Sequence, residues 1–152
     1  MKRFLLLSLI ALLCLPALAQ PKITCGVLNL TVSVKRCFVQ GDMAYTDLLL
    51  TNTSDKDMTL YVLPERATDD EGCSYVNENG TRVYLILDGR GERYYNYFIP
   101  AEGFIRIRVA VKGLDEYATA FQYLGLMVDP SGHDSVSGRK PLIIRNIPIT
   151  RE

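Results

Sequence analysis

Three consecutive carboxylates, Asp69, Asp70 and Glu71, directly precede Gly72. Clustered carboxylate oxygens are ligands that calcium prefers, but an EF-hand loop also needs glycine at its sixth position. Counted from Asp69, that position holds Ser74, and the glycine comes two residues early. Aspartate and glycine are also the residues that tight turns favour. We therefore expect a turn between strands here, with a calcium site outside the EF-hand class as the alternative.

Cys73 follows the acidic turn and is one of three cysteines beyond residue 19, together with Cys25 and Cys37. Acidic neighbours raise the pKa of a thiol, which disfavours a reactive cysteine at this position. If one strand covers most of residues 26–37, its ends lie about 40 Å apart, whereas the Cα atoms of a disulfide lie about 6 Å apart. The sequence therefore favours a disulfide of Cys73 with either Cys25 or Cys37, and the odd count leaves one thiol over.

No catalytic constellation is recognisable in the sequence. His133 is the only histidine, and with Asp134 and Ser135 next to it a catalytic triad cannot easily form, because triads assemble from separated positions. Metalloprotease, P-loop and dinucleotide-binding motifs do not occur. A metal- or carboxylate-dependent hydrolase would have to use Asp69, Asp70, Glu71, Asp88 and Glu92. We expect a loop around His133, a hairpin turn at "DGRGE" (88–92), and a protein that is not an enzyme.

Aromatic residues gather in "RYYNYF" (93–98), where Tyr94, Tyr95, Asn96 and Tyr97 are candidate ligand-binding residues. Tyrosine rings suit wet, half-apolar surfaces and could stack on sugar rings. Strands also favour these residue types, and alternation would place Tyr95 and Tyr97 on one face and Tyr94 and Asn96 on the other. Strand packing and a glycan-binding surface therefore both remain open.

The elements that would position these residues are strands. Alternation of apolar and polar residues begins in "VLNLTVSVKR" (27–36) and is clearest in "FIRIRVAVK" (104–112). It predicts two sets of inward-facing side chains: Leu28, Leu30, Val32 and Val34, then Ile105, Ile107, Val109 and Val111. Turn residues separate about seven to nine such strands, which is typical of an all-β sandwich or barrel. Only "LDEYATAFQY" (114–123) suggests a helical turn.

The N-terminal segment has the pattern of an export signal. Lys2 and Arg3 precede an apolar run at 4–15, and Ala17-Leu18-Ala19 matches the small-residue cleavage site. The run is shorter than the roughly 20 residues that a membrane-spanning helix needs. We expect residues 1–19 to be a signal peptide cleaved near Ala19, and residues 20–152 to form a single domain in the periplasm or outside the cell.

Charge excludes one class of partner. Without Lys2 and Arg3 the 17 basic residues fall to 15 against 17 acidic ones, so the net charge of residues 20–152 is −2. Such a chain has no overall basic field for nucleic acid. No second apolar stretch reaches membrane length, and no cofactor is expected beyond the alternative of calcium.

Four segments occur in an order that resembles one group of proteins: "LLLTNTSDKDMTLYV", "DDEGCSY", "FIPAEGFIRIRVAVKG" and "IRNIPI". With their Asn-rich turn, Asp-x-x-Gly-x-x-Tyr segment and Pro-x-x-Gly lead into a late strand, they are similar to the small secreted telokin-like, immunoglobulin-like domains of Gram-negative gut bacteria. The resemblance covers residues 26–149. It implies an exported, immunoglobulin-like antiparallel β-sandwich, in a group whose members mostly have no assigned activity.

Together these features favour a secreted or periplasmic, non-catalytic binding or interaction module whose ligand is a glycan or an envelope protein. Two alternatives remain. One is the metal- or carboxylate-dependent hydrolase described above. The other is a structural or assembly subunit that pairs through an exposed edge strand.

Overall fold

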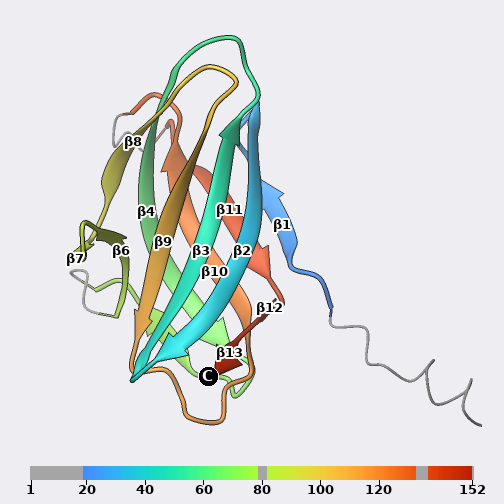
Figure 1. Ribbon diagram of the computed structural model, residues 1–152, viewed down its shortest axis with the longest axis vertical. Coiled ribbons are helices and arrows are strands. Elements are labelled where there is room, and N and C mark those ends of the chain that lie inside the picture. The colour runs from blue at the N-terminus through green and yellow to red at the C-terminus, as the bar shows by residue number, and fades with distance from the viewer. Residues whose placement is uncertain (1–18, 79–81, 133–136, 152) are drawn as a thin grey trace, which may run out of the picture.

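The computed structural model describes residues 19–78, 82–132 and 137–151, and within these ranges it contains strands and no helix. The strands form an immunoglobulin-like β-sandwich of two facing sheets, which confirms the predicted all-β class (Figure 1). The described residues include no helix of the length and hydropathy that crossing a membrane would require. The expected signal peptide lies outside the described residues, except for Ala19.

The first sheet has seven strands and is antiparallel throughout. Its main order is β1 (Lys22–Cys25), β11 (Lys140–Arg145), β10 (Ala120–Asp129), β4 (Met58–Asp69) and β5 (Ser74–Val76). Two further strands join it at the ends of longer ones: β8 (Tyr95–Ile99) pairs with β4, and β12 (Ile147–Pro148) pairs with β10.

The second sheet has six strands and lies in front of the first sheet in Figure 1. Its order is β13 (Thr150–Arg151), β2 (Leu30–Gln40), β3 (Met43–Asn52), β9 (Phe104–Lys112), β6 (Val83–Leu87) and β7 (Arg90–Glu92). Only the short β13 runs parallel to its neighbour. Eight of the strands in the described residues have five or more residues, within the predicted seven to nine, and the shorter ones extend the edges.

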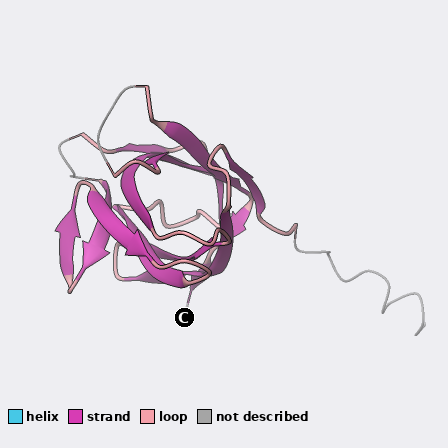
Figure 2. Cartoon of the chain, turned by 90° about the horizontal axis from the view of Figure 1, so that it is seen from above, coloured by secondary structure: helices cyan, strands magenta, loops and turns pink. Residues whose placement is uncertain are grey.

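The core lies between the two sheets, which face each other when the molecule is seen from above (Figure 2). Leu48 and Leu50 of β3 and Val109 of β9 are fully buried from one side, and Leu60 of β4 and Leu124 of β10 from the other. Each such side chain contributes about 1.5–3 kcal/mol by leaving water. Burial of the apolar side chains that the period-two pattern directs inward thus provides the free energy that holds the two sheets together.

The first predicted strand begins later than its pattern suggested. Leu28, expected in the core, is 86% exposed, while Val27 is buried. The chain turns here because Asn29 adopts a left-handed conformation with φ of 59°, and β2 starts only at Leu30. Asparagine tolerates that conformation better than most residues, so a local turn overrides the alternation.

The segment predicted to hold a helical turn contains a single turn and no helix. The backbone N–H of Ala118 donates to the carbonyl of Asp115 at 3.2 Å, which closes the turn. From Ala120 the chain continues as β10, where Phe121 and Leu124 are fully buried. The register of β10 against β4 shifts between Phe121 and Tyr123, which explains why the spacing of these apolar residues does not show a strand period.

Candidate functional site

The acidic segment forms a hydrogen-bonded turn between β4 and β5. Asp69 is fully buried, and one of its carboxylate oxygens accepts hydrogen bonds from the backbone N–H groups of Glu71 and Cys73 at 3.0 and 2.8 Å. Its other oxygen accepts a hydrogen bond of 2.7 Å from the hydroxyl of Tyr75. Gly72 has φ of 86°, which only glycine adopts at little cost. Asp69 therefore acts as the internal brace of this turn.

Asp70 and Glu71 have different surroundings from Asp69. Asp70 accepts hydrogen bonds from the backbone N–H of Thr119, at 2.9 Å, and from the Thr119 hydroxyl. Partial burial opposes ionisation of Asp70, but these hydrogen bonds outweigh it and lower its pKa. Glu71 is exposed. Within the described ranges no group of three or more His, Cys, Asp or Glu side chains is placed to hold a metal ion. Calcium binding by this segment remains the alternative to a simple turn.

The three cysteines beyond residue 19 are free thiols, so the disulfide considered for Cys73 is not formed. Cys25 ends β1 at the edge of the first sheet, whereas Cys37 is buried on β2 of the second sheet. Burial raises the pKa of Cys37 to about 11, although the Thr46 hydroxyl donates to its sulfur at 3.3 Å. Cys73 lies in the turn after β4 and donates to the Asp115 carboxylate at 3.9 Å. Each thiol thus has its own environment.

The candidate tyrosines do not form one platform. Tyr97 is 8% exposed and belongs to the core, and its hydroxyl has no hydrogen-bond partner among the described residues. Tyr95 is 45% exposed and packs edge-on against Tyr97 with 4.9 Å between ring centroids, so the two do share a face as predicted. Asn96 is exposed, on the other face of β8. Only part of the predicted set is therefore available to a ligand.

Tyr94 is the candidate residue that opens onto a cleft. Its ring is 52% exposed and packs against Tyr61 with 5.3 Å between centroids. Both rings line a cleft of about 350 Å³ together with Glu65, Asn77, Arg93 and Arg139. The Asn77 amide donates to the carbonyls of Pro64 and Arg93, at 2.6 and 3.3 Å, and so ties the approach to β8 to strand β4. We call this the Tyr94 cleft.

Tyr95 opens onto a different hollow of about 450 Å³ beside the β6–β7 hairpin, with Asp88, Arg90 and Glu92 among its lining residues. Asp88 and Gly89 have φ of 48° and 78°, as the central residues of a two-residue hairpin turn do. The turn predicted at "DGRGE" (88–92) is therefore found at Asp88 and Gly89, whereas Arg90–Glu92 form strand β7. The carboxylates considered for a hydrolase are divided between the β4–β5 connection, with Asp69, Asp70 and Glu71, and the β6–β7 hairpin, with Asp88 and Glu92. His133, Asp134 and Ser135 lie outside the described residues.

A further cluster on the outer face of the second sheet was not predicted. Arg36 of β2, Asp47 of β3 and Arg108 of β9 lie side by side in cross-strand register. The Asp47 carboxylate accepts hydrogen bonds from both Nε atoms at 2.6 Å and from Nη2 of Arg108 at 2.9 Å. The two guanidinium groups also lie over the ring of Phe38, 4.6 and 5.3 Å from its centroid. No local motif reveals this cluster, because its members come from three strands.

Electrostatics favours the charged state of this cluster. Burial raises the pKa of Asp47, but the hydrogen bonds and charges of Arg108 and Arg36 outweigh that effect, so the pKa of Asp47 is lowered. The hydrogen bond to Asp47 likewise raises the pKa of Arg108. The arrangement therefore holds two guanidinium groups in fixed positions at the surface.

Comparison with known proteins adds little beyond the fold. No known family and no curated protein matches the sequence. Among solved structures, the chain is similar to WR4, a C. elegans MSP family member, with 9% identity over 82% of this chain and 98% of that chain and a TM-score of 0.43. A PapD-like domain of human CEP192 gives 10% identity, coverages of 80% and 83%, and a TM-score of 0.40.

A family 123 glycoside hydrolase from Clostridium perfringens is also similar, with 8% identity and a TM-score of 0.41 over 88% of this chain but only 28% of that chain. None of these three TM-scores reaches 0.5. A function for this chain therefore has to be inferred from the arrangement of its own side chains.

Proposed function

We propose that this protein is a non-catalytic binding module of the periplasm or the extracellular space, and that its ligand is a glycan bound at the Tyr94 cleft. The observation that carries the proposal is the half-exposed ring of Tyr94 lying against Tyr61 at the cleft wall, with Glu65 and Arg93 beside it. A sugar ring presents an apolar C–H face that packs on an aromatic ring, and hydroxyl groups that bond to charged and amide groups.

The cleft is held in shape before any ligand arrives. Packing on the nearly buried Tyr61 orients the Tyr94 ring, and the Asn77 amide fixes the backbone of Arg93 against β4. A preformed site loses less conformational entropy on binding, so weak individual contacts add up to useful affinity. The export signal expected at residues 1–19 and the resemblance to secreted telokin-like domains of gut bacteria are in keeping with an extracytoplasmic glycan ligand.

The structural roles of the carboxylates support a non-catalytic function. Asp69 and Asp70 accept hydrogen bonds that hold turns together, and Asp47 is paired with two arginines. Asp88 takes a turn conformation that a hairpin requires. Each of these four carboxylates thus has a role in maintaining the fold.

The decisive experiment compares Tyr94→Ala with Phe98→Ala. Phe98 lies on β8, shortly after Tyr94, and is 60% exposed but does not line the cleft, so it is a matched control. We expect a soluble neutral polysaccharide at a hundred times Kd to stabilise the wild type and Phe98→Ala by about 2.7 kcal/mol, seen as a higher unfolding temperature, and to leave Tyr94→Ala unchanged. Equal shifts in the unfolding temperature of both variants would show that the polysaccharide binds outside the Tyr94 cleft. Release of reducing sugar during the assay would show an enzyme instead.

A second candidate function, assembly through an edge strand, is favoured by the apolar side chains around β8. Tyr94, Tyr95 and Phe98 are three of the seven large apolar side chains exposed among the described residues. β8 pairs with β4 on one side, and no other strand of the described chain pairs with it. Such an edge can accept a strand from an envelope protein or a second copy. If the β8 edge mediates assembly, Phe98→Lys should abolish a concentration-dependent rise in mass. The same substitution should leave glycan binding at the Tyr94 cleft unchanged.

A further inference from the structure

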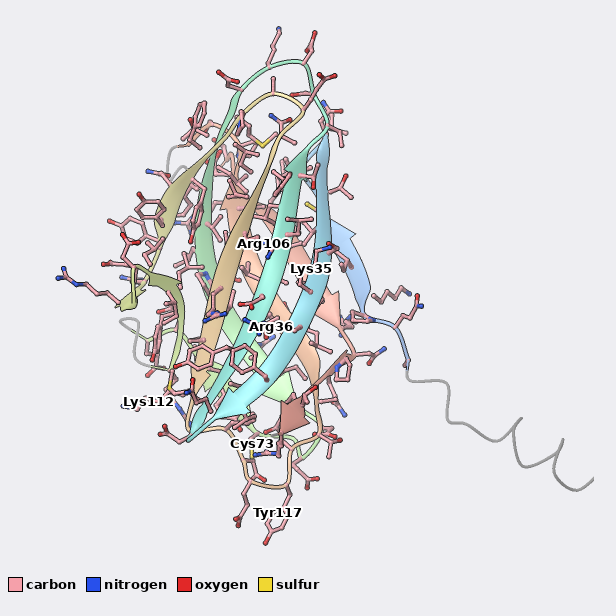
Figure 3. The ribbon with its side chains drawn as sticks, viewed as in Figure 1. Lys35, Arg36, Cys73, Arg106, Lys112 and Tyr117 are labelled. Carbon is pink, nitrogen blue, oxygen red and sulfur yellow. The ribbon has the colours of Figure 1, made fainter. Side chains whose placement is uncertain are left out.

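The outer face of the second sheet concentrates positive charge. Its three longest strands, β2, β3 and β9, contain five cationic residues and one acidic residue, Asp47. The cations are Lys35, Arg36, Arg106, Arg108 and Lys112, which we call the basic face. Figure 3 shows four of them spread over these strands. The basic face with Asp47 carries +4, in a chain whose residues 20–152 sum to −2, so the rest of those residues sum to −6.

Most of this charge is not neutralised within the described chain. Asp47 pairs with Arg36 and Arg108, and only Nε of Arg36 is engaged, so its two terminal nitrogens remain to bind an external group. The side chains of Lys35, Arg106 and Lys112 have no hydrogen-bond or ion-pair partner among the described residues. A surface with unpaired cations around a single carboxylate attracts anions and repels cations.

The arginines converge on one hollow. Arg36, Arg106 and Arg108 line a depression of about 310 Å³ together with Asp47 and Ile86. Two of the three guanidinium groups are positioned in advance, by Asp47 and by the ring of Phe38 beneath them. Guanidinium binds carboxylate and sulfate groups through two parallel hydrogen bonds, which a lysine ammonium cannot do. The hollow therefore suits a flat or tetrahedral anionic group.

The cations continue in a line beyond the hollow. Arg106, Arg108 and Lys112 alternate outward along β9, from its third residue to its last. At about 3.4 Å per residue the line is about 20 Å long. Phe104, 62% exposed at the start of the same strand, adds a ring against which a sugar can pack. A row of this kind matches a linear ligand with repeated charges better than a single small anion.

We propose that the basic face binds an acidic polysaccharide, a chain that bears carboxylate or sulfate groups, lying along β9 with one anionic group in the hollow between Arg36, Arg106 and Arg108. This site lies on the second sheet, whereas the Tyr94 cleft is built from β4, β5 and the approach to β8 on the first sheet. The two binding proposals can therefore be tested independently. An anionic membrane fits the face less well. Phe38 and Tyr45 lie beneath guanidinium groups and are not offered to acyl chains.

The test measures affinity of the purified protein for polygalacturonate, which carries carboxylates, and for dextran sulfate, with neutral dextran as the uncharged control. We expect binding to one or both anionic polymers, weakened by added salt. The double variant Arg106→Glu, Lys112→Glu should weaken it by at least about tenfold. The matched control Lys22→Glu, Lys140→Glu changes the charge equally on β1 and β11 of the other sheet, and it should bind as the wild type does.

Asp47→Asn removes the only carboxylate of these strands but keeps an amide oxygen that can accept a hydrogen bond from an arginine. It should therefore tighten binding, the opposite of what a purely structural role for the cluster predicts. Three results would overturn the proposal: no binding to either anionic polymer, equal losses in the test and control double variants, or equally tight binding to phosphatidylglycerol vesicles or single-stranded DNA. The last result would identify the face as a lipid or nucleic-acid surface.

Discussion

The hydroxyl of Tyr75 donates a hydrogen bond of 2.7 Å to the buried carboxylate of Asp69. The hydroxyl oxygen of Tyr75 also accepts a hydrogen bond of 2.9 Å from the backbone N–H of Asp115. The Tyr75 side chain thus joins the β4–β5 turn to the β9–β10 loop. The guanidinium of Arg82 lies 4.9 Å from the centre of the Tyr75 ring. Burial, and then the bond to Asp69, raise the pKa of Tyr75, so the hydroxyl keeps its proton at any physiological pH.

Tyr75→Phe should therefore destabilise the fold. The change leaves the Asp69 carboxylate with one donor fewer and the Asp115 N–H without its acceptor, and an unsatisfied buried polar group costs about 1–3 kcal/mol. Urea denaturation would measure the loss as a lower midpoint at unchanged slope. An unchanged midpoint would mean that water replaces both bonds.

Tyr97→Phe is the matched control and should have the opposite sign. Tyr97 is also a buried core residue, 8% exposed against 1% for Tyr75, but its hydroxyl has no partner among the described residues. Removing that hydroxyl relieves a desolvation cost, so we expect unchanged stability or a gain of about 1 kcal/mol in the same urea experiment. A clear loss would reveal a bond, direct or through water, that the hydroxyl makes in solution.

Asp70→Ala tests whether the acidic turn binds calcium or only braces the chain. Loss of the Thr119 hydrogen bonds should lower the free energy of unfolding by about 1 kcal/mol. Glu71→Ala, at an exposed position, should change it by less than about 0.5 kcal/mol. Calcium and a chelator should give the wild type the same unfolding temperature. A calcium-dependent rise that Asp70→Ala removes would instead establish the metal site.

Features that depend on neighbouring residues were visible in the sequence. Alternation along β9 identified Ile107, Val109 and Val111 as core residues, and all three are buried. The Asp88-Gly89 turn was equally clear, because glycine and aspartate favour the backbone conformation that a two-residue hairpin needs. These features are local, so the order of residues carries them.

Features that depend on strand pairing were not visible. Asp47 meets partners 11 and 61 residues away along the chain, and a bulge between Val34 and Arg36 decides which side chain of β2 reaches it. Tyr95 and Tyr97 share one face, as alternation predicted, yet only Tyr97 enters the core. Burial at that point depends on what lies opposite the strand, and a single strand's pattern does not contain that information.

The Asp47 cluster makes stability depend on pH at the acid end. Because the pKa of Asp47 is lower in the folded state than its ordinary value of about 3.9, the ionised carboxylate stabilises the fold. That contribution is complete above about pH 5 and is lost as the pH falls below 4 through the folded pKa. Asp47→Asn should reduce the slope of unfolding free energy against pH in this window. An unchanged slope would show that Arg36 and Arg108 do not hold the carboxylate in solution.

Cys73 should react slowly for a cysteine near the surface. Burial, followed by the negative charges of Asp69 and Asp115, raises the pKa of its thiol, so little thiolate is present at neutral pH. Asp115→Asn removes one of these charges and should speed alkylation by iodoacetamide at pH 7, whereas Cys37 should react only after unfolding, because it is buried and its pKa is raised to about 11. Mass spectrometry of each modified peptide would give the two rates separately. If Asp115→Asn leaves the rate of Cys73 unchanged, the charge of Asp115 does not control this thiol, and the hydrogen bond from its sulfur to Asp115 does not persist in solution.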